Sequence, residues 1–363
     1  MKPVFADDAA IDYAVKLLRQ GRLVAFPTET VYGLGADASN PDAVRRIFQA
    51  KGRPAEHPLI VHIPSVDSIN DWALTVPEAA KQLAARFWPG PLALILNKRP
   101  EVPLVVTGGQ KTVGLRMPDH PVALRLLRAF GGGIAAPSAN RFCRISPTQA
   151  THVEEELDDA VDLILDGGAC QVGVESTIVD LSGNQPKLLR PGHTTRHAIE
   201  AVLQTELIII SQQSEQTSQS GMRAPGMMMV HYAPVTQAML CPADRLPEMI
   251  QELNFRRKKI GILAYSLEQA ENRLISIIRM PERADDYAQA LYTSLRELDS
   301  LQLDMILVEQ PPNTEAWRAI NDRLYKATSA YQPNDHEDAF ITPENERYCA
   351  GGSGTRSIKA LEI

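Results

Sequence analysis

The chain has 363 residues, of which 44% are hydrophobic, and a formal net charge of −7. This length predicts two domains, because single hydrophobic cores stop growing well below it. The acidic balance argues against a protein whose main task is to grip a nucleic-acid backbone, since phosphate contacts need clustered lysine and arginine.

Cysteine usage and apolar runs narrow the class of protein further. The four cysteines, Cys143, Cys170, Cys241 and Cys349, are far apart, which suggests neither a zinc site nor a disulfide framework. The N-terminus lacks the apolar core of a signal peptide, and no apolar run approaches the roughly 20 residues that span a bilayer. We therefore expect a reduced, cytoplasmic enzyme without a membrane segment.

The first part of the chain alternates helix-like and strand-like segments, which indicates an α/β layered structure. An apolar stripe predicts a helix over residues 7–20, and Gly21 ends it. Further helices are expected at 42–50, 77–87 and 121–130. Strands are expected at 24–26, 92–96, 112–117, 134–137, 161–166 and 176–180.

The stretch from residue 24 to 64 contains the first chemically suggestive side chains. Thr28 and Thr30 follow the first of these strands, where it should give way to a loop. Gly33 and Gly35 then allow tight backbone or the close approach of a ligand.

The helix at 42–50 leads to two cations, Lys51 and Arg53, on a loop that contains glycine and proline. Asn40 is its expected N-cap, with Pro41 at the first helical position. Cations and hydroxyls on loops at strand ends suit a polyanionic ligand in an open α/β sheet. A solvated turn remains the alternative interpretation of the Lys-x-Arg pattern taken alone.

After residue 203 the character of the chain changes. A short apolar strand is expected at 207–210, and residues 211–221 have the Gln/Ser/Thr-rich composition of a linker. A second α/β unit is expected from a strand at 259–265, a helix at 284–301, a strand at 304–308 and a helix at 316–327. The predicted division is a catalytic domain at 1–205, a linker at 206–234, a C-terminal domain at 235–330 and a disordered tail at 331–363.

Seven motifs in order resemble the YrdC-like domain, over roughly residues 8–205. They are Pro27-Thr28-Glu29-Thr30-Val31-Tyr32-Gly33, Lys51-Gly52-Arg53-Pro54, Pro58-Leu59-Ile60-Val61-His62, Trp88-Pro89-Gly90-Pro91, Val113-Gly114-Leu115-Arg116-Met117-Pro118, Ala136-Pro137-Ser138-Ala139-Asn140 and Glu175-Ser176-Thr177-Ile178-Val179-Asp180. The chain is similar to the two-domain form of that family, the threonylcarbamoyl-AMP synthases, and its segment Ile320-Asn321-Asp322-Arg323-Leu324 resembles the family's C-terminal domain. The resemblance implies a twisted mixed open sheet with flanking helices, plus a smaller Rossmann-like α/β domain.

The resemblance also implies a reaction. Members of the family are nucleotidyltransferases that form L-threonylcarbamoyl-AMP and pyrophosphate from L-threonine, bicarbonate and ATP. The product supplies the threonylcarbamoyl modification of adenosine 37 in tRNAs that read ANN codons. The implied partners are these substrates and the downstream tRNA-threonylcarbamoyl transferase machinery, with weak or no direct tRNA binding. No acidic metal-ligand cluster stands out, so we expect Mg²⁺ to arrive with ATP and no metal site in the protein.

Four cations stand at or near strand ends, and their mutual repulsion would have to be offset by a bound anion. The resemblance assigns catalysis to Lys51, Arg53, Ser138 and Asn140. It assigns ATP binding to Lys51, Arg53, His57, Thr112, Ser138, Ser146, Arg190 and Tyr232. It assigns L-threonine binding to Thr30, His62, Arg116, Ala136 and Ser176, with Arg116 pairing the substrate carboxylate.

Three positions depart from the family pattern. His57 stands where the family often has Asn, and Arg141-Phe142-Cys143-Arg144 replaces a small, Gly-containing turn. In the segment 225–234, which folds back over the active site in the family, Met228-Met229-Val230 replaces basic or aromatic residues. The segment is apolar enough to disfavour exposure, and it is expected to cover the ATP site with Tyr232 as a nucleotide contact.

Two other functions fit the same first domain. One is a carbamoyltransferase that makes a carbamoyl adenylate from carbamoyl phosphate, although the extra domains usual in such proteins are not visible in this sequence. The other is a non-catalytic RNA-binding module with a positively charged concave face. The acidic net charge and the second domain favour the synthase over both.

Overall fold

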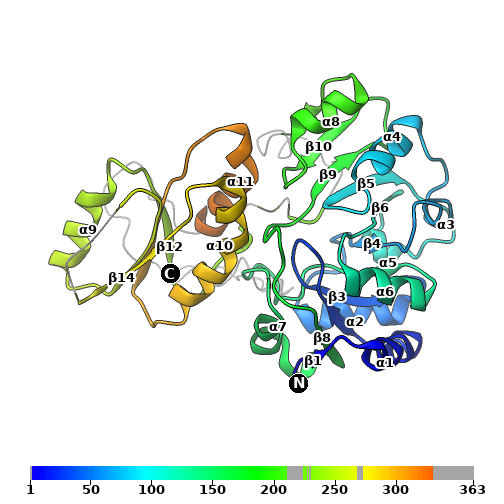
Figure 1. Ribbon diagram of the computed structural model, residues 1–363, viewed down its shortest axis with the longest axis horizontal. Helices are drawn as coiled ribbons and strands as arrows, with labels where there is room; N and C mark the ends of the chain where they lie inside the picture. Colours follow the sequence, from blue (N-terminus) through cyan, green and yellow to red (C-terminus); the bar gives the residue numbers. More distant parts are fainter. Residues whose placement is uncertain (1, 211–223, 227, 229, 268–272, 330–363) are drawn as a thin grey trace, which may run out of the picture.

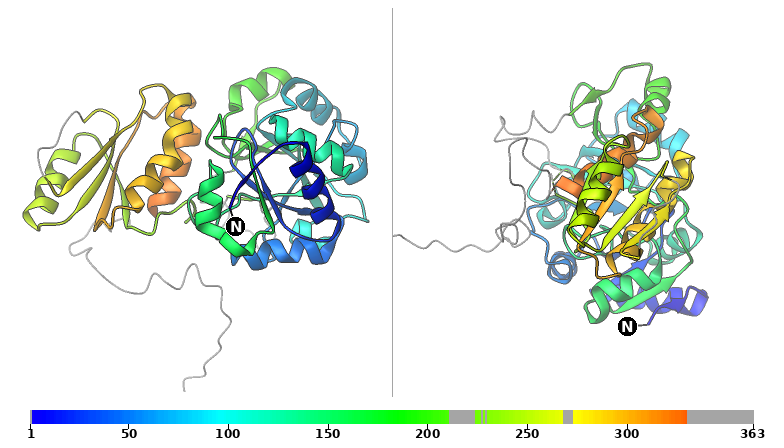
Figure 2. Two further views of the ribbon diagram at one scale, coloured as in Figure 1. Left: turned by 60° about the horizontal axis from the view of Figure 1, so that its bottom comes forward. Right: turned by 90° about the vertical axis from the view of Figure 1, so that its left-hand side faces the viewer.

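The structure is a computed structural model that describes residues 2–210, 224–226, 228, 230–267 and 273–329. The predicted disordered tail at 331–363 and the predicted linker composition at 211–221 lie outside the described residues. Two layered α/β units lie side by side, the larger formed by the first 210 residues (Figures 1 and 2).

A mixed sheet forms the centre of the first unit. Its 11 strands run in the order β1-β8-β2-β3-β7-β4-β6-β5-β9-β10-β11, with parallel and antiparallel neighbours. The strands are β1 (Val4–Phe5), β2 (Val24–Phe26), β3 (Gly33–Asp37), β4 (Ile60–His62), β5 (Leu92–Asn97), β6 (Thr112–Arg116), β7 (Ile134–Ala135), β8 (Leu163–Asp166), β9 (Thr177–Asp180), β10 (Lys187–Arg190) and β11 (Ile208–Ile209).

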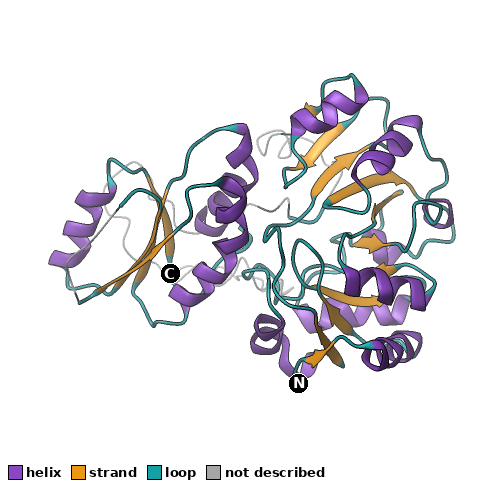
Figure 3. Ribbon diagram, viewed as in Figure 1, coloured by secondary structure: helices purple, strands orange, loops and turns teal. Residues whose placement is uncertain are grey.

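Helices cover both faces of this sheet (Figure 3). They are α1 (Asp8–Arg19), α2 (Pro41–Lys51), α3 (Ile69–Trp72), α4 (Glu78–Phe87), α5 (Leu104–Thr107), α6 (Pro121–Phe130), α7 (Ala150–Leu157) with the 3-10 turn Asp158–Ala160, and α8 (Arg196–Leu203). One core packs α1 and α6 on the sheet through residues such as Leu18 and Leu126. The main core packs α2 and α4 through residues such as Ile47 and Leu83.

The ends of helix α2 follow directly from its sequence. The Asn40 side chain accepts hydrogen bonds from the backbone N–H groups of Asp42 and Ala43, and Pro41 opens the helix. The helix ends at Gly52, whose φ of 62° lies in the left-handed region that glycine adopts without strain. This ending places Lys51 on the last turn and Arg53 just after it.

Gly33 and Gly35, where the sequence predicts tight backbone or the close approach of a ligand, lie in strand β3, antiparallel to β2. A Cβ atom on Gly35 would lie 2.8 Å from the Phe26 ring and 3.0 Å from the carbonyl oxygen of Val24. Glycine at this position therefore admits the neighbouring strand rather than a ligand.

The second unit is built on four parallel strands in the order β12-β15-β13-β14. These are β12 (Ala238–Cys241), β13 (Ile260–Ala264), β14 (Ile275–Arg279) and β15 (Met305–Glu309). Its helices are α9 (Leu246–Phe255), α10 (Ala284–Asp299) and α11 (Arg318–Thr328), the last preceded by the 3-10 turn Glu315–Trp317. Helix α9 covers the outer face of the sheet, whereas α10 and α11 cover the face toward the first unit (Figure 1). The predicted fold class, a twisted mixed sheet plus a smaller α/β domain, is confirmed.

Candidate active site

A cavity opens in the first unit where it meets the second, and its empty volume, mouth included, is about 550 Å³. The segment that returns from residue 224 supplies part of its wall. The lining residues are Thr28, Thr30, Val31, Gly33, Arg53, Ile60, His62, Arg116, Ala136, Pro137, Ser138, Glu175, Ser176, Arg190, Pro225, Gly226, His231 and Tyr232.

Most of the predicted site residues meet at this cavity. Those that line it are Thr30, Arg53, His62, Arg116, Ala136, Ser138, Ser176, Arg190 and Tyr232. The predicted residues outside the lining are Lys51, His57, Thr112, Asn140 and Ser146. The ligand that each of these residues binds stays a prediction.

Two parallel strands place a histidine and an arginine next to each other at one end of the cavity. In the register of β4 and β6, His62 lies opposite Arg116. Burial, reinforced by the charge of Arg116, lowers the pKa of His62 well below its ordinary value, so the imidazole is neutral at neutral pH. Arg116 donates from Nε to the carbonyl oxygen of Gly90 at 3.2 Å, and its Nη2 lies 2.6 Å from Oε1 of Glu29. The cation predicted to bind a carboxylate is thus already paired.

The two cations after helix α2 differ in what they contact. Nζ of Lys51 donates to the carbonyl oxygens of Ser138 and Asn140, which holds the Ser138–Asn140 loop against the helix. Burial, followed by the charge of Arg53, lowers the pKa of Lys51 well below its usual range. Arg53 donates from Nη2 to the carbonyl oxygen of Pro58 at 3.0 Å, whereas its buried Nε contacts no acceptor among the described residues. Burial lowers the pKa of Arg53 to about 10, so its guanidinium still carries its charge at neutral pH.

A third cation joins the strand β10 to the returning segment. Arg190 donates from Nε to the carbonyl oxygen of Ser176 at 3.0 Å and from Nη2 to the Ser176 hydroxyl at 3.2 Å. Its Nη1 donates to the carbonyl oxygen of Pro225 at 3.0 Å. Because Ser176 and Pro225 both line the cavity, Arg190 fixes two of its walls.

Tyr232 reaches the cavity in an unusual backbone conformation, with a φ of 63°. A Cβ atom on Gly226 would lie 2.4 Å from the Tyr232 hydroxyl, so only glycine fits at residue 226 beside this ring. The Tyr232 ring is 1% exposed, and its hydroxyl has no hydrogen-bond partner among the described residues. A buried phenol hydroxyl next to a cavity is suited to a ligand, because such groups are seldom left unpaired.

The predicted residues outside the lining have other surroundings. Thr112 lies at the opposite end of β6 from Arg116, paired with Asn97 of β5. The Ser146 hydroxyl donates to Oε1 of Glu175 at 2.5 Å. In the loop that departs from the family pattern, the Phe142 ring packs against His57 at 5.5 Å.

Comparison with known proteins agrees with this geometry. The family described as "Telomere recombination" matches residues 16–192, and the family described as "Threonylcarbamoyl-AMP synthase, C-terminal domain" matches residues 194–329. Threonylcarbamoyl-AMP synthase of Bacillus subtilis is 42% identical over 88% of this chain and 93% of its own length. The chain belongs to the threonylcarbamoyl-AMP synthase family.

Two further relatives extend the match. Threonylcarbamoyl-AMP synthase of Pyrococcus abyssi is 42% identical over 88% of this chain and 94% of its own length. The crystal structure of Pyrococcus abyssi Sua5 complexed with L-threonine superposes with a TM-score of 0.82 at 40% identity, and covers 88% of this chain and 94% of that one. Both domains of this synthase-family chain therefore have the family's arrangement.

Sequence reasoning missed two carboxylates of this synthase-family site. Glu29 pairs with Arg116, and Glu175 lines the cavity. Each of the two glutamates lies inside a family motif, directly before a predicted site residue, Thr30 or Ser176. This position in the motif could have identified them as site residues. Among the described residues no group of three or more His, Cys, Asp and Glu side chains could hold a metal ion. In the same part of the chain no helix is long and apolar enough to cross a membrane.

Proposed function

We propose that this chain is an L-threonylcarbamoyladenylate synthase that forms threonylcarbamoyl-AMP and pyrophosphate from L-threonine, bicarbonate and ATP. The observation that carries the proposal is the meeting of Arg53, Arg116 and Arg190 at one cavity in a chain of this family. Three cations and several hydroxyls in one enclosed space suit a nucleotide triphosphate together with an amino-acid carboxylate. The proposed role of the product is the threonylcarbamoyl modification of adenosine 37 in tRNA.

The threonine site is proposed at the end of the cavity near β4 and β6. Arg116 would pair with the substrate carboxylate. The substrate would either replace Glu29 as the partner of Arg116 or share Arg116 with it. The paired hydroxyls of Thr28 and Thr30, 2.9 Å apart, lie on the same wall and supply partners for polar groups of the substrate. Neutral His62 offers a buried Nδ1 that has no partner among the described residues. A threonine site in this chain is consistent with the crystal structure of Pyrococcus abyssi Sua5, which contains L-threonine.

The nucleotide site is proposed at the other end, between Arg53, Arg190 and Tyr232. The amino group of threonine adds to CO₂ derived from bicarbonate, and a carbamate oxygen then attacks the α-phosphorus. The new O–P bond forms as the bond to the β-phosphate oxygen breaks, and pyrophosphate leaves. Such a transfer depends on positioning and charge neutralisation rather than on a covalent enzyme intermediate, and fixed cations at the phosphates provide both.

We propose that Mg²⁺ is brought by ATP. The carboxylates next to the cavity, Glu29 and Glu175, are each paired with an arginine, so neither presents a free pair of oxygens. The charges around the proposed phosphate site are cationic, which fits a metal held by phosphate oxygens better than one held by the protein.

The test is pyrophosphate release with ATP, Mg²⁺ and bicarbonate, comparing L-threonine with L-serine and L-valine, and identification of the adenylate by mass spectrometry. We expect threonine-dependent release well above that with valine, because a site that hydrogen-bonds a hydroxyl is left with unpaired polar groups by an analogue without it. Equal rates for valine and threonine would overturn the assignment. Adenylate formed from carbamoyl phosphate without threonine would instead indicate the carbamoyltransferase alternative.

A further inference from the structure

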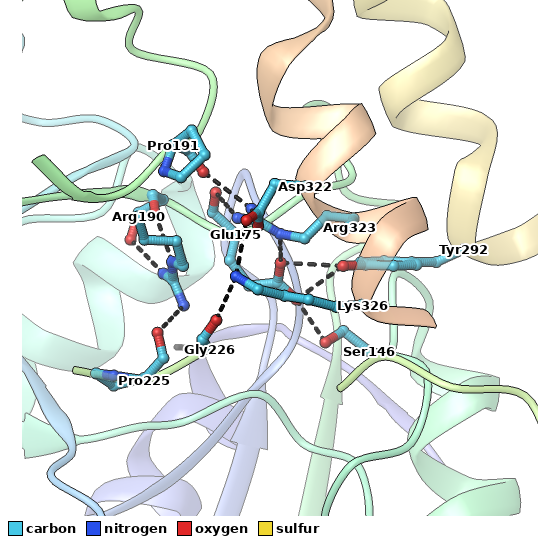
Figure 4. Close-up of polar contacts among 11 residues, drawn as sticks. Ser146, Glu175, Arg190, Pro191, Pro225, Gly226, Tyr292, Asp322, Arg323 and Lys326 are labelled. Atoms are coloured by element: carbon cyan, nitrogen blue, oxygen red, sulfur yellow. Dashed lines mark hydrogen bonds and ion pairs between the residues drawn. The ribbon is translucent and has the colours of Figure 1, made fainter. Parts of the chain in front are cut away.

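Helix α11 of the second unit carries a fully buried arginine that reaches the first unit (Figure 4). Arg323 has 0% exposure, and its Nε lies 2.7 Å from Oε2 of Glu175. Its Nη2 donates to the backbone carbonyl of Glu175 at 3.2 Å, and its Nη1 to the carbonyl of Pro191 at 2.9 Å. The guanidinium carbon also lies 5.3 Å from the centre of the Tyr232 ring. One side chain thus contacts two walls of the cavity, at Glu175 and at Tyr232.

Glu175 is the point where these contacts converge (Figure 4). Besides Arg323 it accepts hydrogen bonds from the Ser146 hydroxyl at 2.5 Å and from the Tyr292 hydroxyl at 3.0 Å. Burial alone would raise its pKa, but Arg323, Arg190 and the Ser146 hydroxyl outweigh burial and lower the pKa to about 2. The next residue in the chain is Ser176, whose oxygens hold Arg190. A fixed Glu175 therefore also fixes the positions of Ser176 and Arg190.

A second cation of the same helix holds the returning segment. Nζ of Lys326 donates to the carbonyl oxygen of Gly226 at 2.7 Å and forms an ion pair with Asp322 at 2.8 Å. The backbone N–H of His231 donates to the carbonyl oxygen of Lys326 at 3.3 Å. Both Gly226 and His231 line the cavity, so helix α11 holds this wall at two points.

Not every arginine at the interface between the two units adjoins the cavity. Another arginine of the second unit, Arg296 on α10, crosses the interface to Glu156 at 3.1 Å and to the carbonyl oxygen of Ile145 without touching a residue of the cavity wall. Removing an ion from water is costly, so a buried ion pair is weak evidence for a gain in stability. The pair formed by Arg323 and Glu175 adjoins the cavity, because Glu175 is one of its lining residues.

We propose that Arg323 and Lys326 are positioning residues of the reaction, and that the second unit completes the cavity by holding Glu175, Gly226, His231 and Tyr232. This inference rests on the proposed synthase function for its kinetic part. Arg323 touches neither the proposed substrates nor the reacting atoms; it acts through Glu175, Ser176 and Tyr232.

The experiment compares Arg323→Met with the matched control Arg296→Met in the full chain. Each variant removes one interface arginine. Loss of one partner from a buried charged pair leaves the other charge unpaired, so kcat/KM for threonine-dependent pyrophosphate release should fall about 100-fold or more in Arg323→Met. Arg296→Met should stay within about threefold of the wild type, because neither Glu156 nor Ile145 lines the cavity. Arg323→Lys keeps the charge but loses the planar fork, so it should rescue only part of the loss.

Hydrogen–deuterium exchange gives a second readout that needs no turnover. Peptides that contain residues 174–178 and 230–234 should exchange faster in Arg323→Met and in Lys326→Met, and should exchange as in the wild type in Arg296→Met. Equal losses in Arg296→Met and Arg323→Met, by rate and by exchange, would overturn the inference and leave helix α11 as a docking surface only. A wild type without threonine-dependent release would refute the proposed function, while the exchange pattern would still decide the positioning role.

Discussion

Each of the two units has a place that is suited to an anion, and the two places differ in the groups that surround them. In the second unit the carboxylate of Glu309, the last residue of β15, accepts hydrogen bonds from the backbone N–H groups of Tyr265, Ser266 and Leu267 at 2.7, 2.9 and 3.2 Å. Successive backbone N–H groups after a parallel strand form a typical anion site. In the first unit, Arg53 at the cavity keeps a buried Nε with no acceptor among the described residues.

The two places differ in whether a carboxylate of the same unit accepts hydrogen bonds from their donors. The second unit fills its own anion site with a side chain. Burial would raise the pKa of Glu309, but the Ser266 hydroxyl and the three backbone donors outweigh it and lower the pKa. The first unit gathers Arg53, Arg116 and Arg190 at one cavity, and their mutual repulsion favours the binding of an anion.

The largest effect is expected from removing the charged side chain of Arg53. Arg53→Ala should lower kcat/KM by about 30- to 1,000-fold, equivalent to roughly 2–4 kcal/mol, by analogy with the loss of an oxyanion donor. Arg53→Lys should recover part of this loss, since it keeps the charge without the fork. The control is Arg45→Ala, an exposed arginine in helix α2 that pairs with Asp42. Wild-type activity in Arg53→Ala would mean that Arg53 makes no contact with ATP that the reaction needs.

The next effect concerns Glu175, whose pKa falls from 4.5 to about 2 on folding. A lowered pKa adds stability above the unfolded pKa, and this stability is lost as pH falls through the folded value. The shift corresponds to roughly 3 kcal/mol of unfolding free energy. Glu175→Gln should therefore be less stable than the wild type at pH 6, and the gap should narrow between about pH 4.5 and pH 2.

Urea unfolding of both proteins at pH 6, 4 and 3 measures this gap. A difference in unfolding free energy that stays constant across these pH values would show that ionisation of Glu175 beside Arg323 adds no stability to the folded protein. The exposed carboxylate of Asp8 pairs with the exposed Arg125, so Asp8→Asn serves as the control and should change the stability little at any of these pH values.

The sequence predicted the residues that line the cavity better than the contacts between the two units. Arg53, Arg116 and Ser176 lie in local motifs that a resemblance can transfer, and the structure places all of them at the cavity. Arg323 lies 148 residues from Glu175, and no local spacing announces that the two will meet. The same limit applies to Lys51 and Thr112, because which neighbours they contact depends on strand and loop register.

Elements with weak periodicity were also missed. Helix α7 has an acidic, eight-residue sequence with few apolar positions, and β14 is an edge strand whose residues are only partly buried. Strand β3 was not predicted, because Gly33 and Gly35 carry no side chain to signal burial. Long segments with a clear stripe, such as α1 and α10, agreed with the prediction within two residues at each end.

A smaller effect should follow from neutralising the carboxylate that fills the second unit's anion site. Glu309→Gln weakens hydrogen bonds from three backbone donors, and the expected loss is about 1–2 kcal/mol of unfolding free energy. Threonine-dependent pyrophosphate release should be unchanged, since the residue lies away from the cavity lining. Calorimetric titration with ATP should give one site per chain in both proteins. A second ATP site in Glu309→Gln would show that the carboxylate excludes a nucleotide.

The smallest effect tests how far the filled site depends on any one donor. The Ser266 hydroxyl donates to Oε1 of Glu309, whereas the three backbone donors all reach Oε2. Ser266→Ala should therefore cost only about 0.5–1.5 kcal/mol of stability, because the carboxylate keeps its backbone partners. Ser300→Ala removes an exposed hydroxyl that donates to the carbonyl oxygen of Glu297 at 2.7 Å, and it controls for the loss of a serine hydroxyl in the same unit. Both variants should keep the wild-type KM for ATP and for threonine. If Ser266→Ala changed either KM while Ser300→Ala did not, the filled site would be coupled to the open one, and the second unit would contribute to catalysis by more than the contacts of helix α11.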